Sequence, residues 1–201
     1  TIEKLTPDTK LIVLQLGDEI GGSIHVSTRI NSDLNVVEQV KLFTECMMGM
    51  LKSFCENFVE VEYYSVHGNH SRVTPWKEES LEKENFTAFS DWYIREAMRD
   101  IKHFKFPQNR FYGIAEFKVF DKTIVGLHGH QTGFDSVTKV AHTLGYIPSQ
   151  TNVGHWHTFH NKDFGRTRVI GNPSMCGVDS YANDKLLYGV PHQLLEVFYE
   201  N

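Results

Sequence analysis

Apolar residues along this chain follow two periods, one typical of helices and one typical of strands. Between Asn35 and Phe58 they recur at three- and four-residue steps, which predicts a long helix that begins with a capping box of Asn35 and Glu38. Leu11–Leu16 is a short apolar run typical of a buried strand, and Val59–Val66 alternates as a strand does. Two further helices are predicted, over Thr87–Ile101 and Asp135–Leu144. The remaining predicted strands are Arg110–Phe120, Thr123–Leu127, Asn152–Val153, Thr167–Ile170 and Gln193–Tyr199.

This order of elements predicts a single α/β domain over residues 1–201, with a hairpin at Asp121-Lys122. Four of the predicted strands end in a glycine-flanked cluster of Asp, Asn or His. These clusters are Gly17-Asp18, Gly68-Asn69-His70, His128-Gly129-His130 and Gly154-His155-Trp156-His157. If the four strands share one sheet, their carboxyl ends meet at one edge, where ligands bind in α/β folds.

Carboxylate, amide and imidazole groups without thiolate suit Mn, Zn or Fe and speak against a structural zinc knot. The spacing of His155 and His157 on a strand end predicts that both rings point to the same side. Taken singly, each cluster has a plainer explanation. Gly17-Asp18 is a common turn, and His128 alone reads as a hydrogen-bonded loop histidine. The succession of four such clusters is what indicates a metal site.

The series GD, GNH, H and GHxH resembles the motif series of the calcineurin-like metallophosphoesterases, and it extends over most of the chain. The surrounding segments LQLGDEIGGSIH and SVHGNHSR look most like the phage and DNA-repair-exonuclease branch of that family. The resemblance implies a layered β-sandwich flanked by helices. It also implies hydrolysis of phosphate esters, of the phosphodiester or nuclease type, by a water activated by two metal ions.

By the same resemblance, Asp18 bridges two metals, and His157 belongs to the first metal site. Asn69, His128 and His155 complete the second site. His70 is a catalytic group beside Asn69 that donates a proton to the leaving oxygen or stabilises the transition state, with a structural loop histidine as the alternative. Arg29 and Arg72 are candidates for binding phosphate, because guanidinium pairs with two oxygens, although an exposed surface role is as fitting for each.

The family opens with an Asp-x-His motif that is absent here, since no such triplet occurs among the 201 residues. We therefore expect that Thr1 follows a missing first strand, that two ions bind in the full-length protein, and that this chain holds at most one and is impaired in catalysis. A catalytically silent binding or scaffold module that keeps the fold is the alternative. Mn is the expected metal, with Zn, Fe or Ni open, and a small phosphomonoester remains open as substrate.

Composition limits the partners. The formal net charge of −5 argues against a broad basic face for nucleic acid, although metal ions can supply local positive charge to DNA or a nucleotide. No apolar run is long enough to span a bilayer, which favours a cytoplasmic protein without a membrane partner. Cys46 and Cys55 are predicted to be buried thiols in a reducing compartment. A missing strand would leave apolar sheet surface exposed, which favours self-association.

Several other side chains are of interest without a firm role. Four histidines near the clusters are candidate partners of the ligands: His25, His67, His130 and His160. Trp76 and Trp156 are candidates for stacking a base, whereas Trp92 is predicted to lie in the core. The sequence leaves the natural substrate, the metal, the cleavage polarity and the oligomeric state open.

Overall fold

The structure, a computed structural model, describes residues 8–131, 136–178, 182–183 and 188–200. Its contacts divide the chain into two compact units, each described here by itself. The first unit comprises residues 1–15, 19–65 and 70–109, and the second comprises residues 16–18, 66–69 and 110–201. The prediction of a single domain stays a prediction. No helix in the described part of the chain is both long and apolar enough to cross a membrane.

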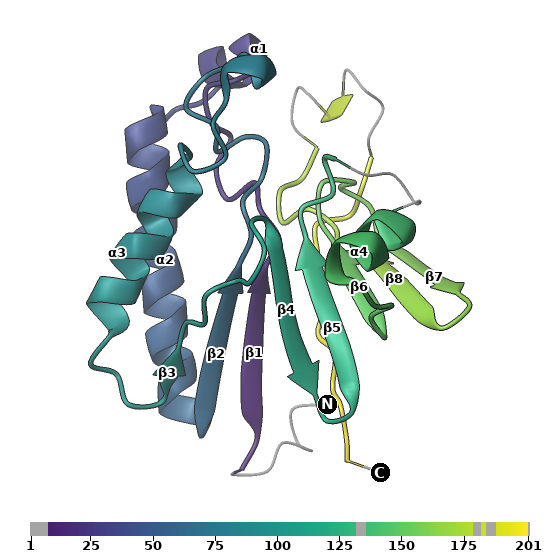
Figure 1. Cartoon of the computed structure of the whole chain (residues 1–201). Coiled ribbons are helices and arrows are strands. Elements are labelled where there is room, and N and C mark those ends of the chain that lie inside the picture. The colour runs from purple at the N-terminus through teal and green to yellow at the C-terminus, as the bar shows by residue number, and fades with distance from the viewer. Residues whose placement is uncertain (1–7, 132–135, 179–181, 184–187, 201) are drawn as a thin grey trace. The chain divides into compact units, whose positions relative to one another are not determined.

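The first unit is a three-stranded sheet with helices α2 and α3 side by side on one face (Figure 1). Strand β1 pairs in parallel with β2, and β2 pairs in parallel with β3. Its elements are β1 (Lys10–Gln15), α1 (Val26–Ile30), α2 (Val36–Asn57), β2 (Glu60–Ser65), the 3-10 helix η2 (Lys77–Glu79), α3 (Phe86–Met98) and β3 (Phe104–Lys105).

The core of this unit shows which faces of helices α2 and α3 are buried. Buried side chains of α2, β2 and α3 pack together: Leu51, Val61, Tyr63, Ile94 and Met98. The capping box of α2 is confirmed, because the Asn35 side chain accepts from the Val37 and Glu38 amides and Glu38 accepts from the Asn35 amide. The structure thus confirms the long amphipathic helix and both predicted strands.

Two burial predictions in the first unit are wrong. Trp92 is 56% exposed, because the buried face of α3 is formed by Thr87, Ser90, Ile94 and Met98 and Trp92 lies off that face. Cys46 is exposed and lies outside the face of α2 that Val40, Thr44 and Leu51 bury. Cys55 is partly buried, and burial raises the pKa of its thiol.

The second unit is a five-stranded sheet of order β4-β5-β6-β8-β7, with α4 packed on it (Figure 1). Strands β5, β6 and β8 run parallel, while β4 and β7 pair antiparallel with their neighbours. Its core is formed by Val125, Leu127, Val140, Leu144, Val153 and Val169. The elements are β4 (Ile114–Val119), β5 (Lys122–Leu127), α4 (Ser136–Leu144), β6 (Gln150–Val153), β7 (His160–Phe164) and β8 (Thr167–Gly171).

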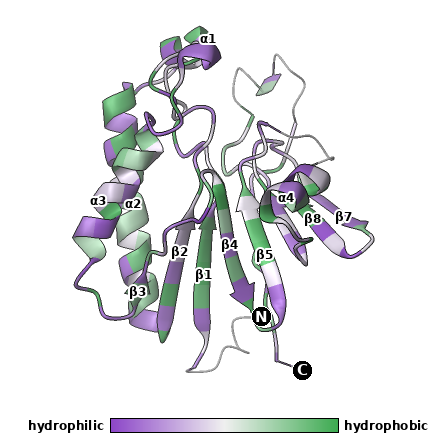
Figure 2. Ribbon diagram, viewed as in Figure 1, coloured by the Kyte–Doolittle hydropathy of each residue, from purple (hydrophilic) through white to green (hydrophobic). Residues whose placement is uncertain are grey.

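Figure 2 shows β5 changing from hydrophilic at its start to hydrophobic toward its end, where it enters this core. The β4–β5 hairpin and the strands over β6 and β8 are confirmed. The predicted helix start at Asp135 lies outside the described residues, and Gly145, with φ of 79°, ends α4 as predicted.

Two features of the second unit differ from the prediction. Strand β7, at the edge of the sheet beside β8, was not predicted. The predicted strand over Gln193–Tyr199 is wrong, because residues 190–200 carry no strand. Instead, the Leu194 amide donates to Asn172 Oδ1, and Glu196 accepts from Gln150. The last segment is therefore fixed by side chains and not by a strand ladder.

The α/β class, with two sheets and flanking helices, is confirmed. The expectation that all four ligand-bearing strands share one sheet is wrong, because β1 and β2 belong to the three-stranded sheet and β5 and β6 to the five-stranded one. The residues directly after β1 and β2, Leu16–Asp18 and Val66–Asn69, nevertheless belong to the second unit together with the ends of β5 and β6. The donors therefore come from the loops that follow these strands and not from a shared sheet edge.

Candidate metal centre

Three of the predicted ligands form one cluster within the second unit. The ligand atoms of Asp18, His128 and His155 all lie within 4.8 Å of one another. His128, at the end of β5, is buried, while Asp18 is partly buried and His155 is exposed. The cluster therefore has one open side, through which a ligand can enter.

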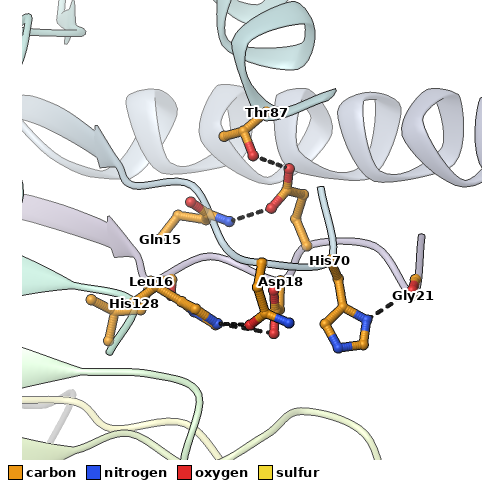
Figure 3. A network of polar contacts seen from close by, with 9 residues as sticks. Gln15, Leu16, Asp18, Gly21, His70, Thr87 and His128 are labelled. Carbon is orange, nitrogen blue, oxygen red and sulfur yellow. Dashed lines mark hydrogen bonds and ion pairs between the residues drawn. The ribbon is translucent and has the colours of Figure 1, made fainter. Parts of the chain in front are cut away.

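Asn69 lies against the same imidazole. Its Oδ1 is 3.0 Å from His128 Nε2, and Asp18 Oδ2 is also 3.0 Å from that nitrogen. The other ring nitrogen, His128 Nδ1, lies 2.7 Å from the Leu16 carbonyl oxygen, a contact drawn in Figure 3. Because a carbonyl only accepts, Nδ1 carries the proton in this contact.

The tautomer of His128 has a direct electrostatic consequence. In the neutral ring with a proton on Nδ1, the lone pair of Nε2 faces the Asp18 carboxylate and the Asn69 amide oxygen. Three electron-rich atoms then converge on one point, which is unfavourable unless a cation lies among them. The donor set thus fits a divalent cation, and the Leu16 carbonyl orients the ring as metal-bound histidines require.

Backbone strain also collects in these loops. Asp18, His155 and His157 are non-glycine residues with positive φ values of 53°, 62° and 59°. Such conformations are costly for L-residues and persist where the surroundings impose them, often at ligand sites. Strand β6 ends at Val153, so His155 and His157 stand in a loop and not on a strand end. The predicted common direction of the two rings therefore has no basis in a strand.

Close packing explains the glycines of the motifs. A Cβ on Gly68 would overlap Oδ1 and the backbone amide of Asp18, although the backbone of Gly68 itself needs no positive φ. The need for glycine here is one of space, because the chain passes directly beside the Asp18 carboxylate.

His157 is not among the histidines and carboxylates of this cluster, and the remaining predicted site residues belong to the first unit. In that unit, His70 Nδ1 lies 2.8 Å from the Gly21 carbonyl oxygen, a contact drawn in Figure 3. The His70 ring meets that of His25 at 5.2 Å between centroids. Arg29, exposed on α1, and Arg72, partly buried and bridged to Asn85, are also residues of the first unit.

Two further histidines of the second unit line a pocket next to His128. Burial, together with repulsion from His128, lowers the pKa of both His67 and His130 to about 4, although the Asp18 carboxylate acts in the opposite direction. Both rings are therefore neutral near pH 7, and each offers one donor and one acceptor nitrogen. The sequence named both as candidate partners, whereas the Leu16 carbonyl had no sequence signal because it is backbone.

No protein-family model matches the chain, and no curated protein matches it. Solved structures resemble it at low identity. An archaeal phosphodiesterase aligns at 12% identity over 85% of this chain and 87% of its own, with a TM-score of 0.41. A conserved uncharacterised protein from Streptococcus pneumoniae, described as a predicted phosphoesterase, aligns at 10% identity over 84% and 75%, with a TM-score of 0.39.

Wild-type Vps29 from Entamoeba histolytica, complexed with zinc, aligns at 10% identity over 84% of this chain and 74% of its own, with a TM-score of 0.32. At identities and TM-scores of this size, what these proteins bind or hydrolyse does not transfer to this chain. The chemistry of the chain follows from its own cluster: Asp18, Asn69, His128 and His155 form a site suited to one divalent cation.

Proposed function

We propose that this chain is a divalent-metal-dependent phosphoesterase of the calcineurin-like kind, from the phage and DNA-repair-exonuclease branch that its motifs resemble. The observation that carries the proposal is the convergence of the Asp18 carboxylate, the Asn69 amide oxygen and the His128 imidazole within hydrogen-bonding distance, with His155 in the same cluster. An electron-rich site of this composition suits a cation that in turn binds phosphate oxygens.

Asp18, Asn69, His128 and His155 would hold the ion, and Mn fits this set of oxygen and imidazole donors, with Zn, Fe or Ni as alternatives. When bound, the ion supplies an activated water and positive charge for the phosphoryl oxygens. We propose one ion for the chain as given, because the described residues form one cluster of three His and Asp donors. A second ion would take His157 as a ligand and needs donors beyond those of this cluster.

The chain's own residues then have separate tasks. The Leu16 carbonyl holds His128 so that Nε2 faces the ion, and Gly68 leaves room for the Asp18 carboxylate. His70 follows Asn69 directly, so their Cα atoms are about 3.8 Å apart. Its Nδ1 proton is directed to the Gly21 carbonyl, so in the doubly protonated ring Nε2 would carry the proton that goes to the leaving oxygen. Arg29 and Arg72 are the proposed phosphate-binding side chains.

For the substrate, we propose a phosphodiester, as in a nucleotide or DNA, in a cytoplasmic protein. The net charge of −5 favours a small or single-stranded substrate over a duplex bound through many phosphates. A phosphomonoester is the competing substrate class, and impaired turnover by this chain is expected from its single proposed ion.

A second candidate function is that of a binding or scaffold module that keeps the fold without catalysis, with self-association as one possible mode. It is favoured by two observations: the sequence contains no Asp-x-His triplet, and His157 is not part of the cluster in the described residues. Both candidates predict metal binding, so turnover and not metal content distinguishes them.

The test uses the whole chain with added Mn. It should cleave bis(p-nitrophenyl) phosphate faster than p-nitrophenyl phosphate, and Asp18→Ala should abolish cleavage. Asp163→Ala, which removes an exposed carboxylate on β7, is the matched control and should retain the activity. Activity that persists in Asp18→Ala rules out the metal mechanism. A chain that binds Mn through Asp18 yet cleaves neither ester supports the silent module.

A further inference from the structure

A pocket lies beside the metal cluster in the second unit and has no part in the mechanism above. Its volume is about 250 Å³, and His128 of the cluster forms part of its wall. The side chains that matter for its chemistry come from the turn after β2, from β4, from β5 and its end, and from α4. They are His67, Ile114, Leu127, His130, Lys139 and Val140.

The floor of the pocket is apolar. Leu127 and Val140 are buried members of the core of this unit, and Ile114 packs against the same core. Apolar walls of this kind favour a flat or apolar group over a hydrated ion, because a charge placed against them loses its water without a compensating partner. The floor therefore points to a ligand with a carbon framework.

The rim of the pocket is polar and contains no carboxylate. His130 Nδ1 is buried and has no hydrogen-bond partner among the described residues. His67 stands on the same side, with 6.1 Å between the two ring centroids. Lys139, on the exposed side of α4, also lines the pocket, together with Gln131 and Thr143. A buried nitrogen without a partner is costly, and a ligand atom that pairs with it recovers that cost.

We propose that this pocket binds the heterocyclic base of a nucleotide substrate whose phosphate lies at the metal cluster. The identification of the ligand as part of the substrate rests on the proposed function. A purine or pyrimidine has two apolar faces for the floor and a hydrogen-bonding edge for His130 and His67. The volume lies below the range of roughly 300–1,000 Å³ for drug-sized ligands, which suits one ring system and excludes a whole dinucleotide.

Two other ligand classes fit the pocket less well. A second phosphate would find a single ammonium group, Lys139, and an apolar floor, whereas phosphate sites usually combine several charged or backbone donors. A second metal would need three close donors, and among the described residues His67 and His130 belong to no such cluster. The base is therefore the ligand class that uses both the floor and the rim.

Binding is tested on the metal-free full chain in the presence of a chelator, so that no catalysis is needed. Adenosine, uridine and inorganic phosphate are titrated separately while the imidazole NMR signals of His67 and His130 are followed. We expect a nucleoside to shift both signals with saturation at concentrations of about 10 mM or lower, and phosphate not to compete. The proposal is overturned if neither nucleoside binds, or if inorganic phosphate competes with the nucleoside for the pocket.

Variants make the assignment specific. His130→Phe keeps a ring but removes the nitrogen, and it should weaken nucleoside binding about tenfold. It should not lower the melting temperature, because a buried nitrogen without a partner is a cost to the fold that the variant removes. His142→Phe on the exposed side of α4 is its matched control. If His130→Phe fails to fold, Lys139→Met against Lys118→Met gives the same comparison at the rim, with a severalfold loss expected for Lys139→Met alone. Equal affinity in variant and control contradicts the base site.

The two proposals fail in different ways. If the chain binds adenosine but cleaves no ester with Mn, the base-site proposal stands and the phosphoesterase proposal fails. If the chain cleaves bis(p-nitrophenyl) phosphate but binds no nucleoside, the phosphoesterase proposal stands and the base-site proposal fails.

Discussion

His128 Nε2 lies 3.0 Å from Asp18 Oδ2, and the opposite nitrogen of the same ring is directed to a backbone carbonyl. The contact looks like an ion pair, but the tautomer fixed by the Leu16 carbonyl turns it into two electron-rich atoms facing each other. A cation among them relieves this repulsion. The relationship therefore favours a bound cation at this point of the site.

Metal binding should stabilise the fold. At Mn concentrations about 100-fold above the dissociation constant, the gain is about 2.7 kcal/mol, or a rise in melting temperature of roughly 5–10 °C for a chain of this size. His128→Gln should lose this rise, whereas His142→Gln, an exposed histidine on α4, should keep it. Melting curves with Mn and with chelator measure the effect. A full metal-induced rise in His128→Gln would contradict the proposed ligand set.

The stoichiometry of the site is a separate prediction. Elemental analysis after dialysis should find about one Mn per chain and essentially none in Asp18→Ala, because the described residues form one cluster of His and Asp donors. Two tightly held ions per chain would show that His157 or other residues complete a second site.

Gly68 should be intolerant of any side chain. In Gly68→Ala the new Cβ overlaps the Asp18 carboxylate and amide, so we expect Asp18 to move and Mn affinity to fall at least tenfold. Gly49→Ala is the matched control, since a Cβ at this position in α2 meets nothing within 4 Å. It should leave metal affinity unchanged and stabilise the helix by up to about 1 kcal/mol. Isothermal titration with Mn checks both variants, and equal affinities would disprove the steric role of Gly68.

Asp91 in the first unit gives a pH-dependent prediction. Burial raises the pKa of Asp91 to about 7, with Ser65 and Arg95 acting against the shift and Glu19 adding to it. One of its oxygens is buried without a hydrogen-bond partner in the described residues. Between its ordinary pKa of 3.8 and pH 7, the folded chain binds more protons at this site than the unfolded chain does. Stability therefore falls as the pH rises through this window.

Asp91→Asn removes the titration while keeping the shape. The free energy of unfolding of this variant, taken relative to that of the wild type, should be greater at pH 8 than at pH 5. This difference between variant and wild type should change by roughly 1–3 kcal/mol between the two pH values, after allowance for partial access of water. Urea unfolding at the two pH values measures it, and Asp121→Asn in the exposed β4–β5 turn serves as the control. The same difference at both pH values would refute the prediction.

Local patterns in the sequence were sufficient for the elements whose stability depends on near neighbours. The Asn35 capping box, the amphipathic face of α2 and the β4–β5 hairpin are all short-range features, and the structure confirms each. The candidate ligands Asp18, Asn69, His128 and His155 were also identified from sequence. The order of the motifs along the chain is the same whichever sheet each strand joins.

Long-range pairing decided the rest. Periodicity alone did not separate β1 and β2 from β5 and β6 into two sheets. It also did not show that the segment expected as a strand over Gln193–Tyr199 contacts Gln150 and Asn172 through side chains. Only the tertiary structure shows the Leu16 carbonyl that fixes His128, the tight passage of Gly68 beneath Asp18 and the pocket at His130. The reason is physical. The sequence specifies the chemistry of each side chain, whereas backbone contacts and cavities between distant segments exist only after the chain has packed.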